Sequence, residues 1–555
     1  MQIGGVVSYL GDAGNTNIVR DVVNEATVSG ELDIGGIAGW AYIKETILKQ
    51  VINRGSVQGG ANLGGIIGRT LRSAGDELIE ISDVVNYGNV AATVSENWMS
   101  VGYGGIIGSA EFNATINGAI NYGNISSIAG QNGTSGIVGF ADSSANIQID
   151  HAYNVGKISG VSSAGGIIGE SFGKTSITNV YNAGNISSFF GGGLIGYNAQ
   201  GGRAENSVAI NSRVGKCSEF CGDLSSEEST RIRGIDYDGN MTLKNLYGLK
   251  NMVVNGKKIS STNPNGTDGK DVTPKQLYDA NWWKNTAKFS EANWDFSKVN
   301  NAYKQLPRLK GTDGKVLAGQ NPFPDVRRES STVTYSKDKG VKIAGVSQNR
   351  LDSIVWLADK GVTIGSGSLA VTGQMTYRPQ DKVTRGAMAQ FLQKLAGVNF
   401  KDLETKYKGQ SSKFSDTENL AKKNAARFYA IEWLADSGLT SGCADKKFCP
   451  NSPVTRGAMA EFMQKFAGVV NIPETISSFP DVVTAAGNIT YDGNKKSTKI
   501  PALTPARIGA INWLASVGIT AGSGQLNGVT TYRPQDPVTR GSMAEFLQKL
   551  ASLSV

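Results

Sequence analysis

Three copies of a threonine–arginine pair are the residues of this chain whose type and spacing could bind an anion. They occur in VTRGAMAQF (383–391), VTRGAMAEF (454–462) and VTRGSMAEF (538–546), as Thr384 and Arg385, Thr455 and Arg456, and Thr539 and Arg540. If a helix begins at each threonine, the arginine takes the first helical position, beside unpaired backbone N–H groups and the positive end of the helix dipole. A guanidinium there suits a carboxylate or phosphate ligand. An alternative of equal weight is an internal ion pair of each arginine with Asp325, Asp416 or Asp481.

The sequence lacks the residues of several common catalytic and metal sites. The chain has one histidine, His151, so an H-E-x-x-H zinc site is excluded and a Ser-His-Asp triad would have to use that residue. The four cysteines form two close pairs, Cys217 with Cys221 and Cys443 with Cys449. Three connectivities are open, of which local pairing is the simplest, and disulfides would indicate an extracytoplasmic setting. A four-thiolate zinc site is the rival, but C-x3-C and C-x5-C are poor zinc spacings.

The charge is divided unevenly along the chain. Residues 1–216 hold 11 Lys and Arg against 16 Asp and Glu, so the +8 of the whole chain arises from a strongly basic remainder. A basic half indicates an anionic partner such as a wall polymer, nucleic acid or membrane surface, or simply a solvated basic surface. Nucleic acid ranks last because no motif interleaves aromatic and basic residues. No stretch approaches about 18 uncharged apolar residues, so no membrane span is predicted.

The elements that must position the arginines are helices. Thr384, Thr455 and Thr539 are predicted N-caps, each between a valine and, four residues on, a methionine at the spacing of a hydrophobic staple. An earlier helix is predicted in each copy, at 350–361, 427–438 and 507–518, and each of these segments ends on a glycine suited to the left-handed conformation. Each copy opens with FPD or FSD, and YRP or FCP precedes the valine–threonine–arginine phrase.

This triplicate pattern resembles the S-layer homology domain, over roughly residues 321–555. The resemblance implies noncovalent retention on a secondary cell-wall polymer, with the threonine–arginine pairs lining grooves between repeats. The family's T-R-A-E glutamate, a capping-box partner of the threonine, is replaced here by Ala387, Ala458 and Ser542. Its loss removes negative charge beside each arginine and leaves the arginine freer to bind an anion.

The first 216 residues contain another repeat. The phrases GGVVS, GGIAG, GGIIG, SGIVG and GGLIG recur at steps of 27–40 residues, alternating with phrases that carry Asn24, Asn53, Asn86, Asn121, Asn154 and Asn182. Short β-branched strands between Gly and Asn turns predict an all-β parallel β-solenoid, in which the asparagines are turn or ladder residues. The 40-residue step predicts a protruding loop near LRSAGDELIE (71–80). These phrases resemble the GLUG repeats of bacterial surface proteins, which implies a stalk or adhesive platform.

Residues 217–320 break this period and are predicted to cap the solenoid. Thr273, Pro274 and Gln276 have the pattern of a capped helix start. The aromatic residues that follow are interpreted as the core of the cap, with stacking on sugars as a lesser option. They are Trp282, Trp283, Trp294 and Phe296.

Together these patterns predict a β-solenoid (1–216), a connector (217–320) and a mainly α-helical domain of three repeats (321–397, 398–469 and 470–555). We expect a cell-surface adhesin or stalk, held by its helical repeats on an anionic wall polysaccharide, with glycans or proteins as partners of the solenoid. No cofactor, metal site or catalytic residue is predicted. The alternative is a wall-anchored polysaccharide lyase or hydrolase, but acidic residues such as Asp33, Glu80, Asp142 and Asp150 do not recur in register. MQIGGVVSYLG begins inside a repeat and lacks a basic n-region followed by an apolar run, so it is not a signal peptide. We expect a secreted protein of the bacterial cell surface whose upstream part is missing from this sequence.

Overall fold

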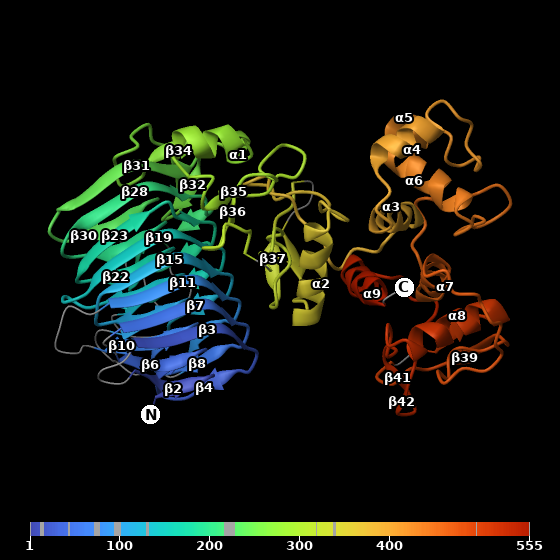
Figure 1. Ribbon diagram of the computed structural model, residues 1–555, viewed down its shortest axis with the longest axis horizontal. Coiled ribbons are helices and arrows are strands. Elements are labelled where there is room, and N and C mark those ends of the chain that lie inside the picture. The colour runs from blue at the N-terminus through green and yellow to red at the C-terminus, as the bar shows by residue number, and fades with distance from the viewer. Residues whose placement is uncertain are drawn as a thin grey trace. The chain divides into compact units, whose positions relative to one another are not determined.

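The protein consists of two compact units, Met1–Ala318 with Val371–Gly373, and Gly319–Ala370 with Gln374–Val555. The computed structural model describes residues 2–11, 16–42, 45–71, 78–93, 101–128, 132–215, 228–317, 319–336, 340–494 and 497–553 (Figure 1). Among these residues, no helix has the length and apolar character needed to cross a membrane.

The first unit is the predicted parallel β-solenoid, whose successive coils each add a strand to four parallel sheets (Figure 1). The first sheet contains β1 (Ile3–Gly4), β5 (Leu32–Gly35), β9 (Ala61–Gly64), β13 (Val101–Gly104), β17 (Asn132–Ser135), β21 (Ser163–Gly165) and β26 (Phe190–Gly192). The second contains β2 (Val7–Leu10), β6 (Ala38–Tyr42), β10 (Ile67–Leu71), β14 (Ile107–Ala110), β18 (Val138–Ala141), β22 (Ile168–Ser171), β27 (Ile195–Asn198) and β30 (Arg233–Asp236).

The two remaining sheets complete each coil. The third contains β3 (Thr16–Asn24), β7 (Glu45–Asn53), β11 (Leu78–Asn86), β15 (Ala114–Asn121), β19 (Asn146–Asn154), β23 (Lys174–Thr178) with β24 (Tyr181–Asn182), β28 (Gly202–Ala209), β31 (Met241–Leu249) and β34 (Lys270–Val272). The fourth contains β4 (Val28–Ser29), β8 (Val57–Gly59), β12 (Val90–Ala92), β16 (Ile125–Ser126), β20 (Ile158–Ser159) and β25 (Ile186–Ser187). Pairing is in register, so like residues stack.

The predicted asparagine ladder is confirmed. Each Nδ2 donates to the Oδ1 of the asparagine one coil later, at 2.7–2.8 Å, from Asn24 through to Asn182. Each Nδ2 also donates to the carbonyl oxygen two residues on, as Asn86 does to Gly88 at 2.8 Å. The asparagines are therefore turn residues and ladder residues at once.

The ladder explains why the glycine phrases recur with the asparagines. A Cβ built on Gly65 would lie 2.4 Å from the Asn86 side chain, and one on Gly105 would lie 2.5 Å from that of Asn121. A larger residue at either position would displace the ladder, so the second glycine of each phrase is fixed by close packing. The loop predicted near 71–80 falls largely on residues 72–77, which lie outside the described residues.

The segment after the solenoid coils lies along their side rather than only at their end. Helix α1 (Pro274–Leu277) has the predicted capping box on Thr273, and the π-helix η1 (Trp282–Thr286) follows. Trp283 and Trp294 are fully buried, and Trp294 packs on the stacked rings of Tyr153 and Tyr181 at 6.2 and 5.6 Å between centroids. The tryptophans thus form an apolar core, as predicted, but one that covers a tyrosine ladder, and their buried rings are closed to sugars.

Small antiparallel ribbons complete both units. In the first unit they are β32 (Met252–Val254) with β33 (Lys257–Ile259), the former also pairing with β29 (Arg213–Val214), and β35 (Trp294–Asp295) with β36 (Arg308–Leu309). In the second they are β37 (Ser331–Val333) with β38 (Val341–Ile343), β39 (Gly487–Ile489) with β40 (Thr498–Ile500), and β41 (Gln525–Leu526) with β42 (Val529–Thr530).

The second unit is mainly helical and contains three copies of a two-helix motif. The first helices are α2 (Gln348–Asp359), α6 (Ala425–Asp436) and α8 (Pro505–Ser516), and the second helices are α3 (Arg385–Leu395), α7 (Arg456–Phe466) and α9 (Arg540–Ser552). The second copy adds α4 (Phe400–Tyr407) and α5 (Leu420–Lys423). The first helices are followed by Gly361, Gly438 and Gly518, each with φ near 70°, as predicted.

The three copies interlock instead of folding separately. The second helix of each copy packs on the first helix of the next, giving the pairs α3 with α6, α7 with α8, and α9 with α2. At the helix entrances three backbone hydrogen bonds of 2.8 Å close a ring, from Val383 N–H to Val538, from Val538 to Val454, and from Val454 back to Val383. The valine of each repeated phrase therefore joins all three copies.

Candidate functional site

The threonines of the repeated phrases cap their helices, as predicted. Thr384, Thr455 and Thr539 each accept a hydrogen bond from the backbone N–H three residues on, at 3.2–3.3 Å. The prediction that the first N–H groups stand unpaired is wrong, because the next copy occupies them. The N–H groups of Arg456 and Gly457, for example, donate to the carbonyls of Asp536 and Pro534 at 2.9 Å. Arg385 and Arg540 have equivalent partners, so the backbone of these helix ends is not an anion site.

Each arginine side chain reaches into the next copy. The Nε atoms of Arg385, Arg456 and Arg540 donate to the carbonyl oxygens of Phe448, Tyr532 and Tyr377, at 2.6–2.8 Å. Each guanidinium also lies near two rings, as that of Arg456 does, 4.7 Å from the centroid of Tyr532 and 5.7 Å from that of Phe546. These contacts are cation–π interactions that hold neighbouring copies together.

The outer atoms of the three guanidinium groups differ in their contacts. The Nη2 of Arg385 donates to the Thr440 hydroxyl at 3.4 Å. The Nη2 atoms of Arg456 and Arg540 are buried and have no hydrogen-bond partner among the described residues. A buried donor without a partner costs about 1–3 kcal/mol, so a ligand that accepts from it would be favoured.

The three aspartates do not pair with these arginines; they hold the turns on which the arginines dock. Asp481 accepts from the N–H groups of Tyr532 and Arg533 at 2.8 and 2.7 Å, and from the Tyr491 hydroxyl at 3.0 Å. Asp325 and Asp416 bind the equivalent turns of their own copies. The second turn residue is left-handed in each case, with φ of 57–58° at Arg378, Cys449 and Arg533. Burial raises the pKa of Asp325 even though its carboxylate accepts these bonds.

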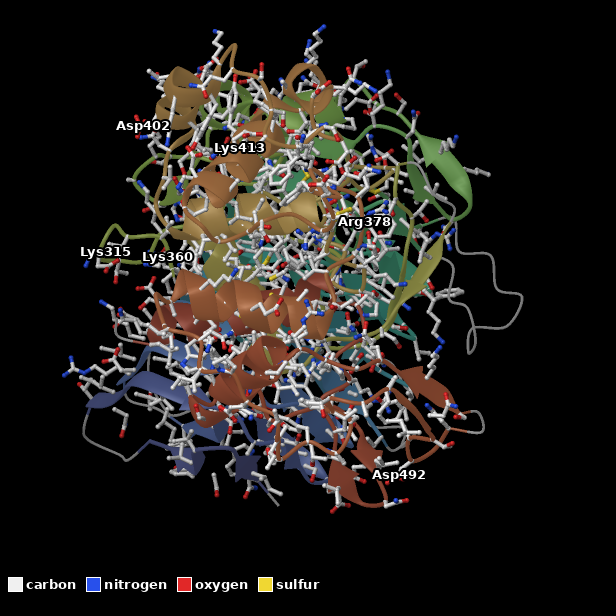
Figure 2. All side chains as sticks on the ribbon, turned by 90° about the vertical axis from the view of Figure 1, so that its right-hand side faces the viewer. Lys315, Lys360, Arg378, Asp402, Lys413 and Asp492 are labelled. Atoms are coloured by element: carbon white, nitrogen blue, oxygen red, sulfur yellow. A yellow bond between two sulfur atoms is a disulfide. The ribbon has the colours of Figure 1, made fainter. Side chains whose placement is uncertain are left out.

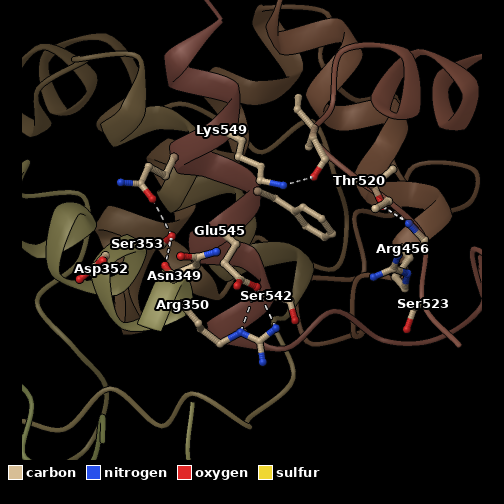
Figure 3. A pocket seen from close by; sticks show the side chains of 15 residues that line it. Asn349, Arg350, Asp352, Ser353, Arg456, Thr520, Ser523, Ser542, Glu545 and Lys549 are labelled. Atoms are coloured by element: carbon tan, nitrogen blue, oxygen red, sulfur yellow. Dashed lines mark hydrogen bonds and ion pairs between the residues drawn. The ribbon is translucent and has the colours of Figure 1, made fainter. Parts of the chain in front are cut away.

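A polar cavity opens between α2, α9 and the loop after α8. It has a volume of about 510 Å³, and Arg456 lies on its far wall from α2 (Figure 3). Arg350 of α2 pairs with Glu545 of α9 at 2.8 Å, and Ser353 donates to Gln548 at 2.6 Å. Of the predicted residues, only Arg456 contributes to this cavity. The complete lining is Asn349, Arg350, Asp352, Ser353, Arg456, Ile519, Thr520, Ala521, Gly522, Ser523, Ser542, Glu545, Phe546, Gln548 and Lys549.

Sequence reasoning missed the α2 residues of this cavity. They are Asn349, Asp352 and Ser353. A motif shared by the three copies does not include them, because the copies differ at these positions. The signal that could have revealed them is the departure of one copy from the other two.

The cysteines divide between the described and undescribed parts of the chain. The predicted disulfide of Cys443 and Cys449 is present, with 6.0 Å between the Cα atoms. Cys217 and Cys221 lie outside the described residues. Among the described residues, no cluster of three or more His, Cys, Asp and Glu side chains is arranged to hold a metal ion.

The first unit buries several ionisable residues, among them His151 and Glu170. The His151 side chain lies 3.0 Å from Asp150 and contacts Asn293, which fastens the side segment to the coils. Glu170 is in register between Phe140 and Tyr197, and burial raises the pKa of its carboxyl to about 7.

Comparison with known proteins bears on the second copy of the helical unit. Residues 414–460 match the family model of the S-layer homology domain, a stretch that runs from Phe414 beyond Arg456. Domains of this family bind secondary polymers of the cell wall, so the match suggests that this protein is anchored at a wall. No curated protein matches the chain.

Proposed function

We propose that this protein is an adhesin or stalk, held noncovalently on a bacterial cell wall by its helical unit, which binds an anionic wall polysaccharide. The observation that carries the proposal is the S-layer homology match over residues 414–460. That stretch contains Asp416, the turn it binds, and the Thr455 and Arg456 pair. The first and third copies have the same contacts, which supports treating all three as one anchoring module.

The solenoid supports the adhesive or stalk part of the proposal. Its coils are joined by in-register sheets and a continuous buried asparagine ladder, so load along the stack is shared by many hydrogen bonds. Its polar faces are the surfaces that glycans or proteins outside the cell would contact.

The test is cosedimentation of the full chain with purified bacterial sacculi. We expect pelleting with native sacculi, weakened as salt is added, because part of the attraction is electrostatic. Sacculi stripped of their attached polymers with hydrofluoric acid should not carry the protein down. Equal pelleting with stripped and native sacculi would contradict retention on a wall polymer.

A wall-anchored enzyme that acts on polysaccharides is the second candidate, and Glu170 is the observation that favours it. A carboxyl whose pKa is about 7 can donate a proton near neutral pH, as the general acid of a glycosidase does. The assay is release of reducing sugars from a panel of glycans, with Glu170→Gln as the matched variant. Activity that survives this substitution would remove Glu170 from the reaction.

A further inference from the structure

The three first helices differ where they face the neighbouring second helix. Three residues of α2 that line the cavity have equivalents at the aligned positions of α6 and α8. In α2 these are Asn349, Asp352 and Ser353, in α6 they are Ala426, Tyr429 and Ala430, and in α8 they are Ala506, Gly509 and Ala510. Only α2 therefore carries polar side chains at all three positions. Asn349 is exposed and Asp352 is half-buried, with its Oδ1 accepting from Gln348 at 2.9 Å, whereas Ser353 is buried and bonded to Gln548 of α9.

On α6 this surface is covered by the linker between the first and second copies. The linker folds into α4, which packs on α6 and forms an apolar cluster with it. Tyr429, in the position of Asp352, is only 6% exposed, and its ring lies 5.7 Å from that of Phe400 on α4. A ligand approaching this face would have to displace α4.

On α8 the linker between the second and third copies takes the same role. Asn471 Nδ2 donates to the carbonyl of Ala506 at 2.8 Å, and the N–H of Glu474 donates to that of Pro505 at 3.0 Å. A Cβ at Gly509 would lie 2.0 Å from the carbonyl oxygen of Ile472, so glycine at this position lets the linker backbone lie directly on the helix.

On α2 the equivalent surface lines the cavity. Asp352 and Asn349 lie at one end of it, and Arg456 and Ser523 at the other (Figure 3). A volume of about 510 Å³ falls in the usual range of pockets for small ligands. The buried Nη2 of Arg456, without a partner among the described residues, supplies a donor at the inner wall.

The charges of this cavity define the ligand further. Its lining holds three cations, Arg350, Arg456 and Lys549, against two carboxylates, Asp352 and Glu545. One of the cations is already neutralised, because Arg350 pairs with Glu545 at 2.8 Å. Such a lining suits a ligand with several hydroxyl groups and one negative charge better than a densely charged polyanion.

From these contacts we infer that the helical unit binds its wall ligand at one site only, the groove between α2 and α9, and that Asn349, Asp352 and Ser353 determine specificity there. The ligand is a hydroxylated segment with a single anionic group, which Arg456 receives while Asn349 and Asp352 bind hydroxyls. Ser353 positions α2 on α9 through its bond to Gln548. This inference rests on the proposed wall binding and adds its stoichiometry and its recognition residues. The inter-repeat linkers close the two related grooves.

The decisive variant gives α2 the residues that the other copies already carry. In Asn349→Ala/Ser353→Ala, both positions become alanine as in α6 and α8. Because Ser353→Ala also removes the bond to Gln548 between α2 and α9, Asn349→Ala alone is measured beside it, and the melting temperatures of both variants are compared with that of the unaltered protein. We expect cosedimentation of the full chain with sacculi to weaken about tenfold, for one lost hydrogen bond of Asn349 to the ligand and the lost Ser353–Gln548 bond that holds the groove. Lys360→Ala is the matched control, because Lys360 lies at the end of the same helix, is exposed and is outside the cavity lining (Figure 2). It should bind as the unaltered protein does.

Two further measurements test the single site and its ligand. Calorimetric titration with polymer fragments released from sacculi should give one site per chain. Arg456→Ala should abolish this site, while Arg385→Ala, which loses the equivalent docking contacts between the first and second copies, should leave it. Competition by glucuronate or glucose 6-phosphate, but not by glucose, identifies the anionic group as a carboxylate or a phosphate.

Each outcome separates the inference from the proposed function. Three sites per chain, equal losses in Arg385→Ala and Arg456→Ala with unchanged melting temperatures, or unweakened binding of the double α2 variant would overturn the single groove while wall binding stands. Competition by glucose as strong as by its charged relatives would overturn the anionic ligand. Failure of the unaltered chain to pellet would overturn wall binding itself, and the inference with it.

Discussion

Replacement of Asn86 by alanine should show how strongly the asparagine ladder holds the solenoid. Its Nδ2 donates to Asn121 and to the carbonyl of Gly88, both at 2.8 Å, and its Oδ1 accepts from Asn53 at 2.8 Å and from the N–H of Gly88 at 3.2 Å. Asn53, Asn86 and Asn121 are fully buried, so water cannot replace the lost bonds. Four groups lose a partner, namely the Nδ2 of Asn53, the Oδ1 of Asn121 and both backbone groups of Gly88, so at about 1–3 kcal/mol each Asn86→Ala should destabilise the neighbouring coils by at least about 4 kcal/mol.

Asn24→Ala is the matched control at the first rung of the same ladder. Asn24 bonds to Asn53 and to both backbone groups of Ala26, but Ala26 is exposed and water can take over there. We expect a cost of about 1 kcal/mol. Amide hydrogen exchange, followed by mass spectrometry in peptides from β7, β11 and β15, measures the opening free energy of these coils. Equal effects of the two variants, or a loss below 1 kcal/mol in Asn86→Ala, would refute the claim that burial makes the ladder stabilising.

Three other predictions address single contacts. Because the pKa of Glu170 rises from 4.5 to about 7 on folding, the solenoid should lose about 3 kcal/mol of stability as pH rises from about 4.5 to above 7, and Glu170→Gln should remove this dependence in urea titrations at several pH values. Asp481→Asn leaves only one accepting oxygen for two N–H groups, so the helical unit should lose about 1–3 kcal/mol, measured by thermal unfolding; no change would contradict the turn-holding role. The Cys443→Ser/Cys449→Ser variant removes the disulfide between two residues six positions apart and should lower the free energy of unfolding by about 2 kcal/mol. Reductant should have the same effect on the unaltered protein.

Features encoded within one repeat could be predicted from sequence. The threonine caps, the left-handed glycines after the first helices and the capping box at Thr273 depend on residues three to five positions apart, where backbone geometry alone decides. The asparagine ladder was accessible for a related reason, because a repeat of fixed period places like residues in register.

Features that depend on packing between repeats could not be predicted. Nothing local to Arg385 indicates that its Nε binds the carbonyl of Phe448 in the next copy, since this contact follows from the interlocked helix pairs. The same is true of the backbone N–H groups at the helix starts, which a single repeat leaves unpaired and the assembled unit satisfies. The tryptophan segment was correctly predicted to be buried, but its position beside the tyrosine ladder follows from long-range contacts such as that of Trp294 with Tyr181.

The repeated phrase is explained by assembly of the three copies, whereas the inferred specificity residues lie where the copies differ. Valine, threonine and arginine are the same in all three copies because each makes the same contact with a neighbouring copy: the backbone ring at Val383, the helix cap at Thr384, and the docking of Arg385 on an aromatic turn. A contact that closes a threefold ring must be made three times, so repetition here indicates assembly. Recognition of one ligand needs only one site, and at the groove inferred above the repeated Arg456 is joined by Asn349 and Asp352, which lie where the copies differ. Comparison of repeats within a chain should accordingly seek binding residues at the positions where one copy departs from the others and a linker leaves the surface open.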